Sequence, residues 1–600
     1  MLVLVTGLIA ASPRPDVQAF ALGLVVPGGG FLAWAGAENT ISILAISLFA
    51  ISLLAFLLAL AIWFATGNIL LPLTVWLVTA LVAAGAETIW RPALDIVPVA
   101  AFLALGLAYG AATIAWRLGI RRRARLNAYL RSLEAPAVAA VPETNTAGDE
   151  LSHEGLRLMR LLFDRALQPV ESFEGFEWID QFQTAAVRYQ LNFMSYALSI
   201  AQSVHVPAFH GYFRTAQENL VAKQQDHRIW RYWQLENLWG NLRTSADTIP
   251  RDNIMLSGFL AAQIAYHHGA SGQRTFDAPG SLVFERPSGE RYVYSLPTLI
   301  DALARQYKTS EYGLLACEPN WIYPLCNTIS ASAIRAFDAA NGTAHCDAIE
   351  DSFRHRLETE FITAGGRFVP FRSSVTGFPA PMIGGAVMQA FPYFFLYAVF
   401  PDIAQRQWLV LRRDLTEDGC RRALWPIDVG NYRFSRASSY AATAAAAVEL
   451  GDNEVADRLL SLLDEECPVT VSDHVANRSN ASLWAHSVEL IARCGRAGTL
   501  RSLVTSPRSS APSGPFIQEA TYPDVLVAKA ANANGVLSSV LYPGERSGKK
   551  ALTIGGLAPN NSYVATGAVG EFRFAADTQG TARFELPVDG RTELQIERTG

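Results

Sequence analysis

Residues 41–65 (ISILAISLFAISLLAFLLALAIWFA) form an apolar stretch without a single charged side chain. A helix needs about 20 apolar residues to cross a bilayer, so this stretch is long enough for a membrane span. Residues 69–87 and 96–116 are two further apolar runs. Residues 17–36 are apolar too, but a PGGG sequence interrupts them, so both a broken span and a re-entrant segment fit. Residues 1–125 are therefore predicted to hold three or four transmembrane helices.

The composition and charge of the chain support this reading. Only 17% of the 600 residues are charged, against about 25% in average soluble proteins, and the apolar excess lies before residue 120. Arginines then follow the last predicted span at positions 117, 121, 122, 123 and 125. Because basic residues beside a span favour the cytoplasmic side, we expect a multi-pass membrane protein whose soluble part faces the cytoplasm.

Net charge and cysteine usage narrow the function classes. The formal net charge of −5 gives no reason to expect a nucleic-acid partner. Six cysteines in so long a chain are too few for a disulfide framework, and reduced thiols agree with a cytoplasmic location. The sequence leaves open whether the chain forms a homo-oligomer.

The soluble part divides into two regions with different periodicity. Residues 126–149 are predicted to be a linker, 150–504 a helical catalytic domain, 505–515 a second linker and 516–600 a β-sandwich domain. Apolar residues recur at helical spacing in 151–167, 178–203, 253–267, 325–340, 346–363, 384–398, 436–450, 453–465 and 480–497. About a dozen helices in antiparallel pairs suggest an (α/α)6 barrel, with an irregular bundle as the alternative. After residue 515 the period changes to two, and about seven short strands are expected.

The most distinctive segment is CEPNWIYPLCN, from Cys317 to Asn327. Its prolines forbid a continuous helix, so the two cysteines flank a loop and Cys326 stands at the start of a helix. Two thiols and the carboxylate of Glu318 within ten residues can act as acid and base. Three other readings stay open at this point. The cysteines can be small buried hydrophobes, ligands of zinc with His345 or the pair His267-His268, or partners in a disulfide, which fits a cytoplasmic domain poorly.

This segment resembles the double-cysteine loop of the linalool dehydratase/isomerase family, with the same separation of the cysteines, the same CEP start and the same CN end. Further segments agree in the same order along the chain: Ser172-Phe173-Glu174, Arg188-Tyr189, Arg251 to Gly258 (RDNIMLSG) and Glu449 to Asp452 (ELGD). The resemblance covers roughly residues 150–500. The apolar runs and the C-terminal strands lie outside it.

The resemblance implies a set of site residues. Cys317 and Cys326 match the two active-site thiols, Glu318 the adjacent carboxylate and Tyr189 an active-site tyrosine. Asp164 is the candidate for a catalytic aspartate, although this placement needs a three-residue gap. Met255, Phe259 and Asn327 are assigned to substrate binding. No metal and no organic cofactor is implied.

The sequence departs from the family pattern at two positions. The family has a histidine four residues after the methionine, where this chain has Phe259, and a family tyrosine aligns near Ala386. We therefore expect a changed substrate and an apolar cavity on which Cys317, Cys326, Glu318 and Tyr189 converge. The expected activity is that of a lyase or isomerase acting on a lipophilic alcohol of terpenoid type.

Two rival functions come from other classes. One is an (α/α)-barrel carbohydrate-active enzyme, in which Trp230, Trp233 and Trp239 would stack on sugars; the sequence offers no convincing acid pair for it. The other is a non-enzymatic membrane scaffold, which the missing histidine favours.

Overall fold

The computed structural model describes residues 14–599 except 36–38, 67, 69, 88–95, 134–148, 180–185, 376, 378, 381–384, 422–423, 425–427, 429–433, 473–474, 509–512 and 569. Residues 134–148 of the predicted linker at 126–149 lie outside the described residues. The chain forms two compact units. The first comprises residues 1–125, 233–246 and 318–321, and the second comprises 126–232, 247–317 and 322–600.

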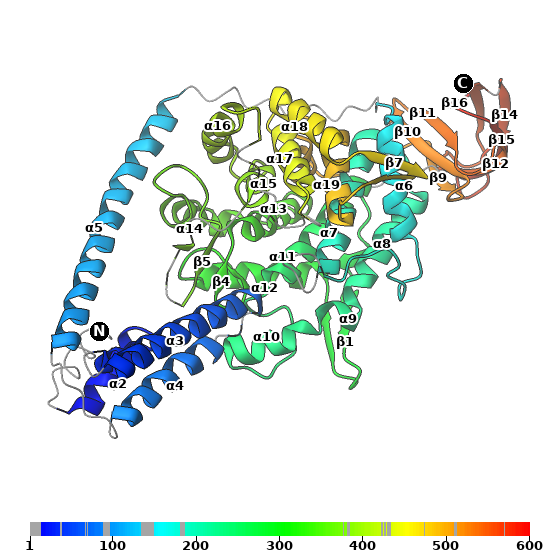
Figure 1. The fold of residues 1–600 in the computed structure, drawn as a ribbon. Helices are drawn as coiled ribbons and strands as arrows, with labels where there is room; N and C mark the ends of the chain where they lie inside the picture. The colour runs from blue at the N-terminus through cyan, green and yellow to red at the C-terminus, as the bar shows by residue number, and fades with distance from the viewer. Residues whose placement is uncertain are drawn as a thin grey trace. The chain divides into compact units, whose positions relative to one another are not determined.

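Small residues bring the helices of the first unit close together. α2 (Pro15–Val25), η1 (Gly29–Trp34), α3 (Asn39–Thr66) and α4 (Leu70–Glu87) pack side by side (Figure 1). A Cβ on Gly23 would lie 2.7 Å from the Cα of Ala80, so only glycine allows α2 this approach to α4. Small residues at helix contacts are typical of membrane proteins. A buried hydrogen bond of 2.5 Å from Trp34 Nε1 to Glu87 Oε2 joins η1 to α4.

Two described helices, α3 and α4, are long and apolar enough to cross a membrane. Large apolar side chains on both are exposed, among them Ile43, Ile51, Leu54, Leu58 and Leu81. The predicted broken span at 17–36 consists of α2, with 11 residues, and the 3₁₀-helix η1. At about 1.5 Å per residue, α2 is too short to cross a bilayer. α5 (Ile96–Ser132) covers the predicted span at 96–116 and continues past the arginines into residues assigned to the linker.

All nine strongly periodic segments of the soluble part form helices, together with several shorter ones. Their bounds are α6 (His153–Ala166), α7 (Ala186–His205), α8 (Gly211–Gln225), α9 (His227–Trp230), α10 (Tyr232–Asn241), α11 (Ile254–Ser271), η2 (Thr275–Asp277), α12 (Leu296–Thr309), α13 (Pro324–Asn341), α14 (Asp347–Glu360), α15 (Ala386–Leu396), α16 (Pro401–Thr416), α17 (Ala437–Glu449), α18 (Asn453–Glu466), α19 (Leu483–Cys494) and α20 (Thr499–Thr505).

Six of these helices follow one another around a closed circuit of contacts. α7 packs on α11, α11 on α13, α13 on α15, α15 on α17, α17 on α19, and α19 on α7 again (Figure 1). We call these six helices the ring. Their centre is filled by aromatic side chains: Phe193 of α7 contacts Phe391 of α15 and Trp484 of α19, with ring centroids 5.5 and 5.0 Å apart.

One end of the ring is closed by the short helix α20, which contacts α7, α11, α13, α15 and α17. Glu449 at the end of α17 accepts hydrogen bonds of 2.9 Å from the backbone N–H groups of Leu500 and Arg501. Arg508 N donates to the carbonyl of Gly269, near the end of α11. α20 therefore lies at the C-terminal ends of the ring helices, and their N-terminal ends lie at the other side.

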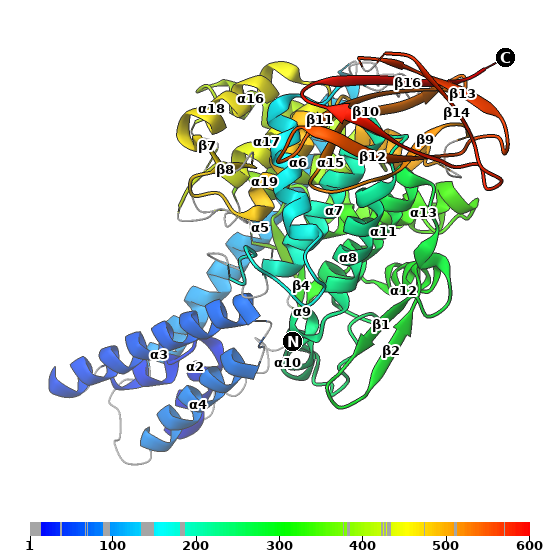
Figure 2. The ribbon, with the colours of Figure 1, turned by 90° about the vertical axis from the view of Figure 1, so that its right-hand side faces the viewer.

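The strands form short sheets in the helical region and two larger sheets after it. The short strands are β1 (Leu282–Glu285), β2 (Arg291–Tyr294), β3 (Ala316–Glu318), β4 (Trp321–Ile322), β5 (Phe371–Ser373), β6 (Pro379–Ala380), β7 (Val469–Ser472) and β8 (Val475–Arg478). The C-terminal strands are β9 (Phe516–Ala520), β10 (Val525–Ala533), β11 (Val536–Pro543), β12 (Gly548–Gly555), β13 (Ser562–Gly567), β14 (Phe572–Ala575), β15 (Ala582–Val588) and β16 (Thr592–Arg598). They pair antiparallel in two sheets, β10-β11-β16-β13-β14 and β15-β12-β9 (Figure 2).

Backbone hydrogen bonds join the C-terminal sheets to the helices. Ile517 N donates to Ala208 O, and Ala208 N donates to Ala530 O. The segment after α7 thus takes part in the β structure. The β region belongs to the same compact unit as the ring.

Candidate active site

Three predicted site residues lie near the N-terminal ends of three successive ring helices. Tyr189 is in the first turn of α7, Met255 in that of α11 and Cys326 in that of α13. Pro324, at the first position of α13, fits there because a helix start has no partner for its missing N–H. The three residues therefore share the end of the ring that faces away from α20.

Tyr189 and Met255 are in contact, and Arg188 joins them. Tyr189 Oη lies 3.4 Å from Met255 Sδ. Arg188 Nη2 lies 2.8 Å from the same sulfur and donates to Tyr189 Oη over 3.1 Å. The buried Arg188 guanidinium also lies over the rings of Tyr189 and Tyr232, at 4.7 and 4.2 Å. A cation is thus held beside the phenol of Tyr189. The sequence did not predict this role for Arg188, although Arg188 precedes Tyr189 in the RY motif.

Phe259 continues this surface with apolar groups. It is buried, and its ring meets that of Tyr189 edge-on with centroids 5.5 Å apart. Phe193 packs on Phe259 from α7. The histidine that the family has at this position is thus replaced by part of an aromatic cluster, which offers no proton-transfer group.

Both loop cysteines are buried, and neither is in a disulfide. Cys326 lies near Tyr196, whose Oη donates to the carbonyl of Phe259 over 2.8 Å. The pKa of Tyr196 is raised well above its ordinary value by burial, and in smaller part by Tyr266 and Cys326. The pKa of the buried Tyr307 is also raised, mainly by burial and in smaller part by Cys317, Cys326 and Cys346. Both loop thiols thus influence the pKa of this buried phenol.

Asn327 holds the double-cysteine loop to its own helix. Its amide oxygen accepts from Leu315 N at 2.7 Å and from Tyr307 Oη at 3.0 Å, and its amide nitrogen donates to the carbonyls of Leu315 and Tyr323. These four bonds use the full capacity of an amide. Asn327 therefore positions the loop, in place of the substrate contact that the sequence suggested.

Asn327→Ala is expected to destabilise the protein and to misplace both thiols. The variant leaves the buried N–H and carbonyl of Leu315 without their partner, and Tyr307 Oη keeps only its longer bond of 3.4 Å to the backbone carbonyl at position 327. Each buried group that loses its partner costs about 1–3 kcal/mol. Denaturant unfolding followed by tryptophan fluorescence measures the loss. Asn561→Ala, on the exposed C-terminal surface, is the matched control; equal stability of both variants would contradict this role.

The two predicted carboxylates lie in different surroundings. Glu318 follows Cys317 in β3, and successive strand side chains point to opposite faces. Glu318 is grouped with the first compact unit, whereas Cys317 belongs to the second. Asp164 is in α6, where its carboxylate accepts a hydrogen bond from Tyr522 Oη of the C-terminal region. That bond gives Asp164 a part in joining the helices to the β sheets.

One group of acidic side chains in the described part of the chain has the spacing of a metal site: Glu154, Asp464 and Glu489. Arg478 and Arg493 already form ion pairs with all three. Their positive charges occupy the place where a cation would bind.

Comparison with known proteins gives one family. Among curated proteins, none matches the chain. Solved structures with some likeness include an unsaturated glucuronyl hydrolase from Streptococcus agalactiae (10% identity, 60% of this chain, 97% of that chain, TM-score 0.35). A GH127 β-arabinofuranosidase (10% identity, 76% of this chain, 80% of that chain, TM-score 0.25) is another. So is a GH127 β-L-arabinofuranosidase from Geobacillus stearothermophilus T6 (11% identity, 80% of each chain, TM-score 0.22). TM-scores this low carry no conclusion about this chain.

The family match begins at Arg188, beside the tyrosine of the cluster, and extends to Trp484, which packs into the centre of the ring. It includes Met255, Phe259 and the whole double-cysteine loop. Residues 188–484 of this chain belong to the linalool dehydratase/isomerase family.

Proposed function

We propose that this protein is a membrane-anchored lyase or isomerase that dehydrates or isomerises a lipophilic, terpenoid-type alcohol. The observation that carries the proposal is the family match over residues 188–484, which includes Tyr189 and Met255, whose side chains are in contact, and also Cys326. Six ring helices with their outer neighbours are arranged, in this proposal, as an (α/α)6 barrel with the site at the N-terminal end of the ring.

The reaction needs an acid on the oxygen side and a base on the carbon side. In dehydration the hydroxyl takes up a proton, the C–O bond breaks and water leaves, and a neighbouring carbon gives up a proton as the new double bond forms. We assign hydrogen bonding of the hydroxyl to Tyr189, which Arg188 orients, and its protonation to Cys317. Cys326, as the thiolate, would accept the proton from carbon. Alternatively it would form a transient C–S bond as the C–O bond breaks, and would take up that proton when the C–S bond breaks again. Glu318 and Asp164 have weaker support, because one projects from the other face of β3 and the other is held by Tyr522.

The apolar surroundings favour a hydrocarbon-rich substrate. Phe193, Phe391 and Trp484 fill the centre of the ring, and Phe259 contacts both Phe193 and Tyr189. An alkyl or alkenyl chain that lies on this uncharged aromatic surface would be held by the hydrophobic effect. The carbohydrate alternative has less support, because Trp230 and Trp233 are each only 1% exposed and cannot stack on sugars, which leaves the half-buried Trp239 as its one candidate among the three.

The activity test uses the full chain in detergent, a tertiary allylic alcohol such as linalool, and gas chromatography of the hydrocarbon products. Turnover is expected for the natural sequence. Tyr189→Phe should lower it about five- to tenfold, because one hydrogen bond to the hydroxyl contributes about 1 kcal/mol. Tyr563→Phe, on a C-terminal strand, should not change it. Absence of turnover with every allylic alcohol of terpenoid size would refute the proposal.

The membrane part of the proposal places residues 150–600 in the cytoplasm. It rests on the exposed apolar helices α3 and α4 and on the arginines of α5. Protease added to sealed, right-side-out cells should leave residues 150–600 intact, and the same protease should digest them after permeabilisation. Digestion in the sealed cells would reverse the orientation.

A further inference from the structure

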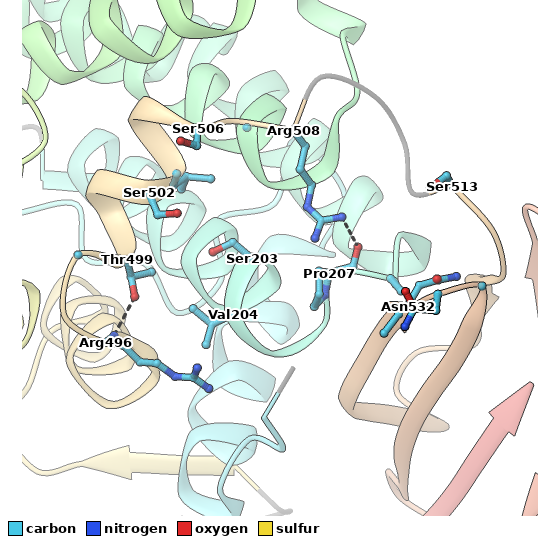
Figure 3. A pocket seen from close by; sticks show the side chains of 17 residues that line it. Ser203, Val204, Pro207, Arg496, Thr499, Ser502, Ser506, Arg508, Ser513 and Asn532 are labelled. Carbon is cyan, nitrogen blue, oxygen red and sulfur yellow. Dashed lines mark hydrogen bonds between the residues drawn. The ribbon is translucent and has the colours of Figure 1, made fainter. Parts of the chain in front are cut away.

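The structure is hollowed at the opposite end of the ring from the proposed active site. A cavity of about 460 Å³ opens there between the end of α7, the helix α20 and the turn that joins β10 to β11 (Figure 3). Small-molecule sites have volumes of about 300–1,000 Å³. Ser203 and Val204 of α7 and Thr499 and Ser502 of α20 contribute to its wall. This cavity is independent of the proposed function, because it lies at the α20 end and contains none of the family-motif residues.

Two arginines line this cavity, and they differ in their partners. Arg496 forms an ion pair with Asp149. Arg508 is partly buried and donates from Nη1 to the carbonyl of Pro207 over 3.4 Å. Within the described part of the chain, no carboxylate forms an ion pair with Arg508. Arginine stays protonated in proteins, so among the described residues its charge lies in this cavity without a carboxylate partner.

The titratable groups nearby do not neutralise that charge. The pKa of His210 is lowered to about 4 by burial, and further by the positive charges of Arg214 and Arg508. Burial raises the pKa of Glu449 to about 8, so this carboxyl is mostly uncharged at neutral pH. Glu449 already caps the first N–H groups of α20, so the helix end is not available as the anion site. The guanidinium of Arg508 remains as the charged group that can hold a ligand.

We propose that this cavity binds a small oxyanion of the phosphate or phosphate-ester class, with Arg508 as its charged anchor. A guanidinium presents parallel N–H donors that match two phosphate oxygens. Ser502 and Ser506 line the same space, and their hydroxyl groups can donate to the remaining oxygens. Val204 and Leu503 form an apolar side that accepts a short alkyl group of an ester. An excess of positive charge makes a metal cation the wrong ligand for this cavity.

The test measures thermal unfolding and calorimetric binding of the full chain in detergent, in a phosphate-free buffer. Inorganic phosphate and n-butyl phosphate are the probes, and sodium chloride of equal ionic strength is the blank. Saturable binding is expected with the natural sequence. Arg508→Gln should weaken it at least about tenfold, because the charge of the anchor is lost. Ser502→Glu should abolish it, because the new carboxylate takes the place of the ligand.

Arg496→Gln is the matched control, since Arg496 lines the same cavity but is already paired with Asp149. It should change phosphate affinity less than about threefold. Tighter binding of n-butyl phosphate would identify an organic phosphate as the ligand, and equal binding would identify the free anion. The proposal is overturned if the natural sequence shows no saturable binding, if Arg508→Gln binds as tightly as the natural sequence, or if Arg496→Gln loses as much as Arg508→Gln.

Discussion

Cys326→Ala and Cys317→Ala are each expected to lower turnover of the alcohol about 10²–10⁴-fold, the contribution typical of an acid or base in the transition state. Each substitution removes one buried sulfur atom and leaves the backbone of the loop in place. Asn327 fixes that backbone through Leu315 and Tyr323, so the loop should keep its conformation. The steady-state rate and the circular dichroism spectrum of the purified variants measure the two effects.

Cys494→Ala provides the control for these variants. Cys494 is also a buried free thiol of a ring helix, but it ends α19, where its carbonyl meets His205 Nε2 at the far end of α7. Loss of the Cys494 thiol should remove packing contacts and lower the stability, and it should leave turnover unchanged. If either loop variant keeps full activity, or if Cys494→Ala loses as much as they do, the loop thiols are core residues and the proposed mechanism is wrong.

The sequence predicts well those elements whose residues repeat over several turns. The periodic segments 253–267 and 325–340 form α11 and α13 with shifts of only a few residues at their ends. The prolines of the double-cysteine loop correctly predict a break before the helix of Cys326. The change to a period of two after residue 515 correctly predicts the C-terminal strands, although the structure has one strand more than the seven expected.

Contacts between segments that are distant in the sequence cannot be predicted from periodicity or from prolines. Asp164 has the right residue type for catalysis, but its partner Tyr522 lies 358 positions away. In the sequence, Asn327 is only the last residue of the double-cysteine motif. Its four side-chain hydrogen bonds in the folded loop identify it as a positioning residue. α20 has seven residues, too few to show a helical period, yet it closes one end of the ring.

Arg478→Met is expected to lower the free energy of unfolding by about 3–5 kcal/mol, the typical cost of removing one partner of a buried ion pair. Arg478 and Glu489 are each only 1% exposed. Arg478 Nε donates to Glu489 Oε2 over 2.7 Å and Nη2 to Glu489 Oε1 over 2.5 Å. Nη1 donates to the carbonyl of Cys467. The variant leaves the Glu489 carboxylate buried, with only the i,i+4 contact from Arg493.

Acid should lower the free energy of unfolding of the natural protein more than that of the Arg478→Met variant. Burial alone would raise the pKa of Glu489, but the hydrogen bonds and charge of Arg478 outweigh it and the pKa is lowered. A carboxyl whose pKa is lower in the folded state stabilises the fold above its unfolded pKa of about 4.3 and loses that contribution as the pH falls through the folded pKa. Denaturant unfolding at pH 7 and at about pH 3 should therefore show a smaller difference between natural sequence and variant in acid.

Two further variants distinguish the effect of the buried ion pair on stability from the effect of an ordinary surface charge. Arg421→Met removes a half-exposed arginine whose partners Glu465 and Glu466 lie 3.4 and 3.5 Å away, so it should cost less than about 1 kcal/mol. The double variant Arg478→Met/Glu489→Leu removes both buried charges and should recover much of the loss, because no unpaired carboxylate remains. If Arg478→Met costs no more than Arg421→Met, water reaches Glu489 and this ion pair does not hold β8 to α19.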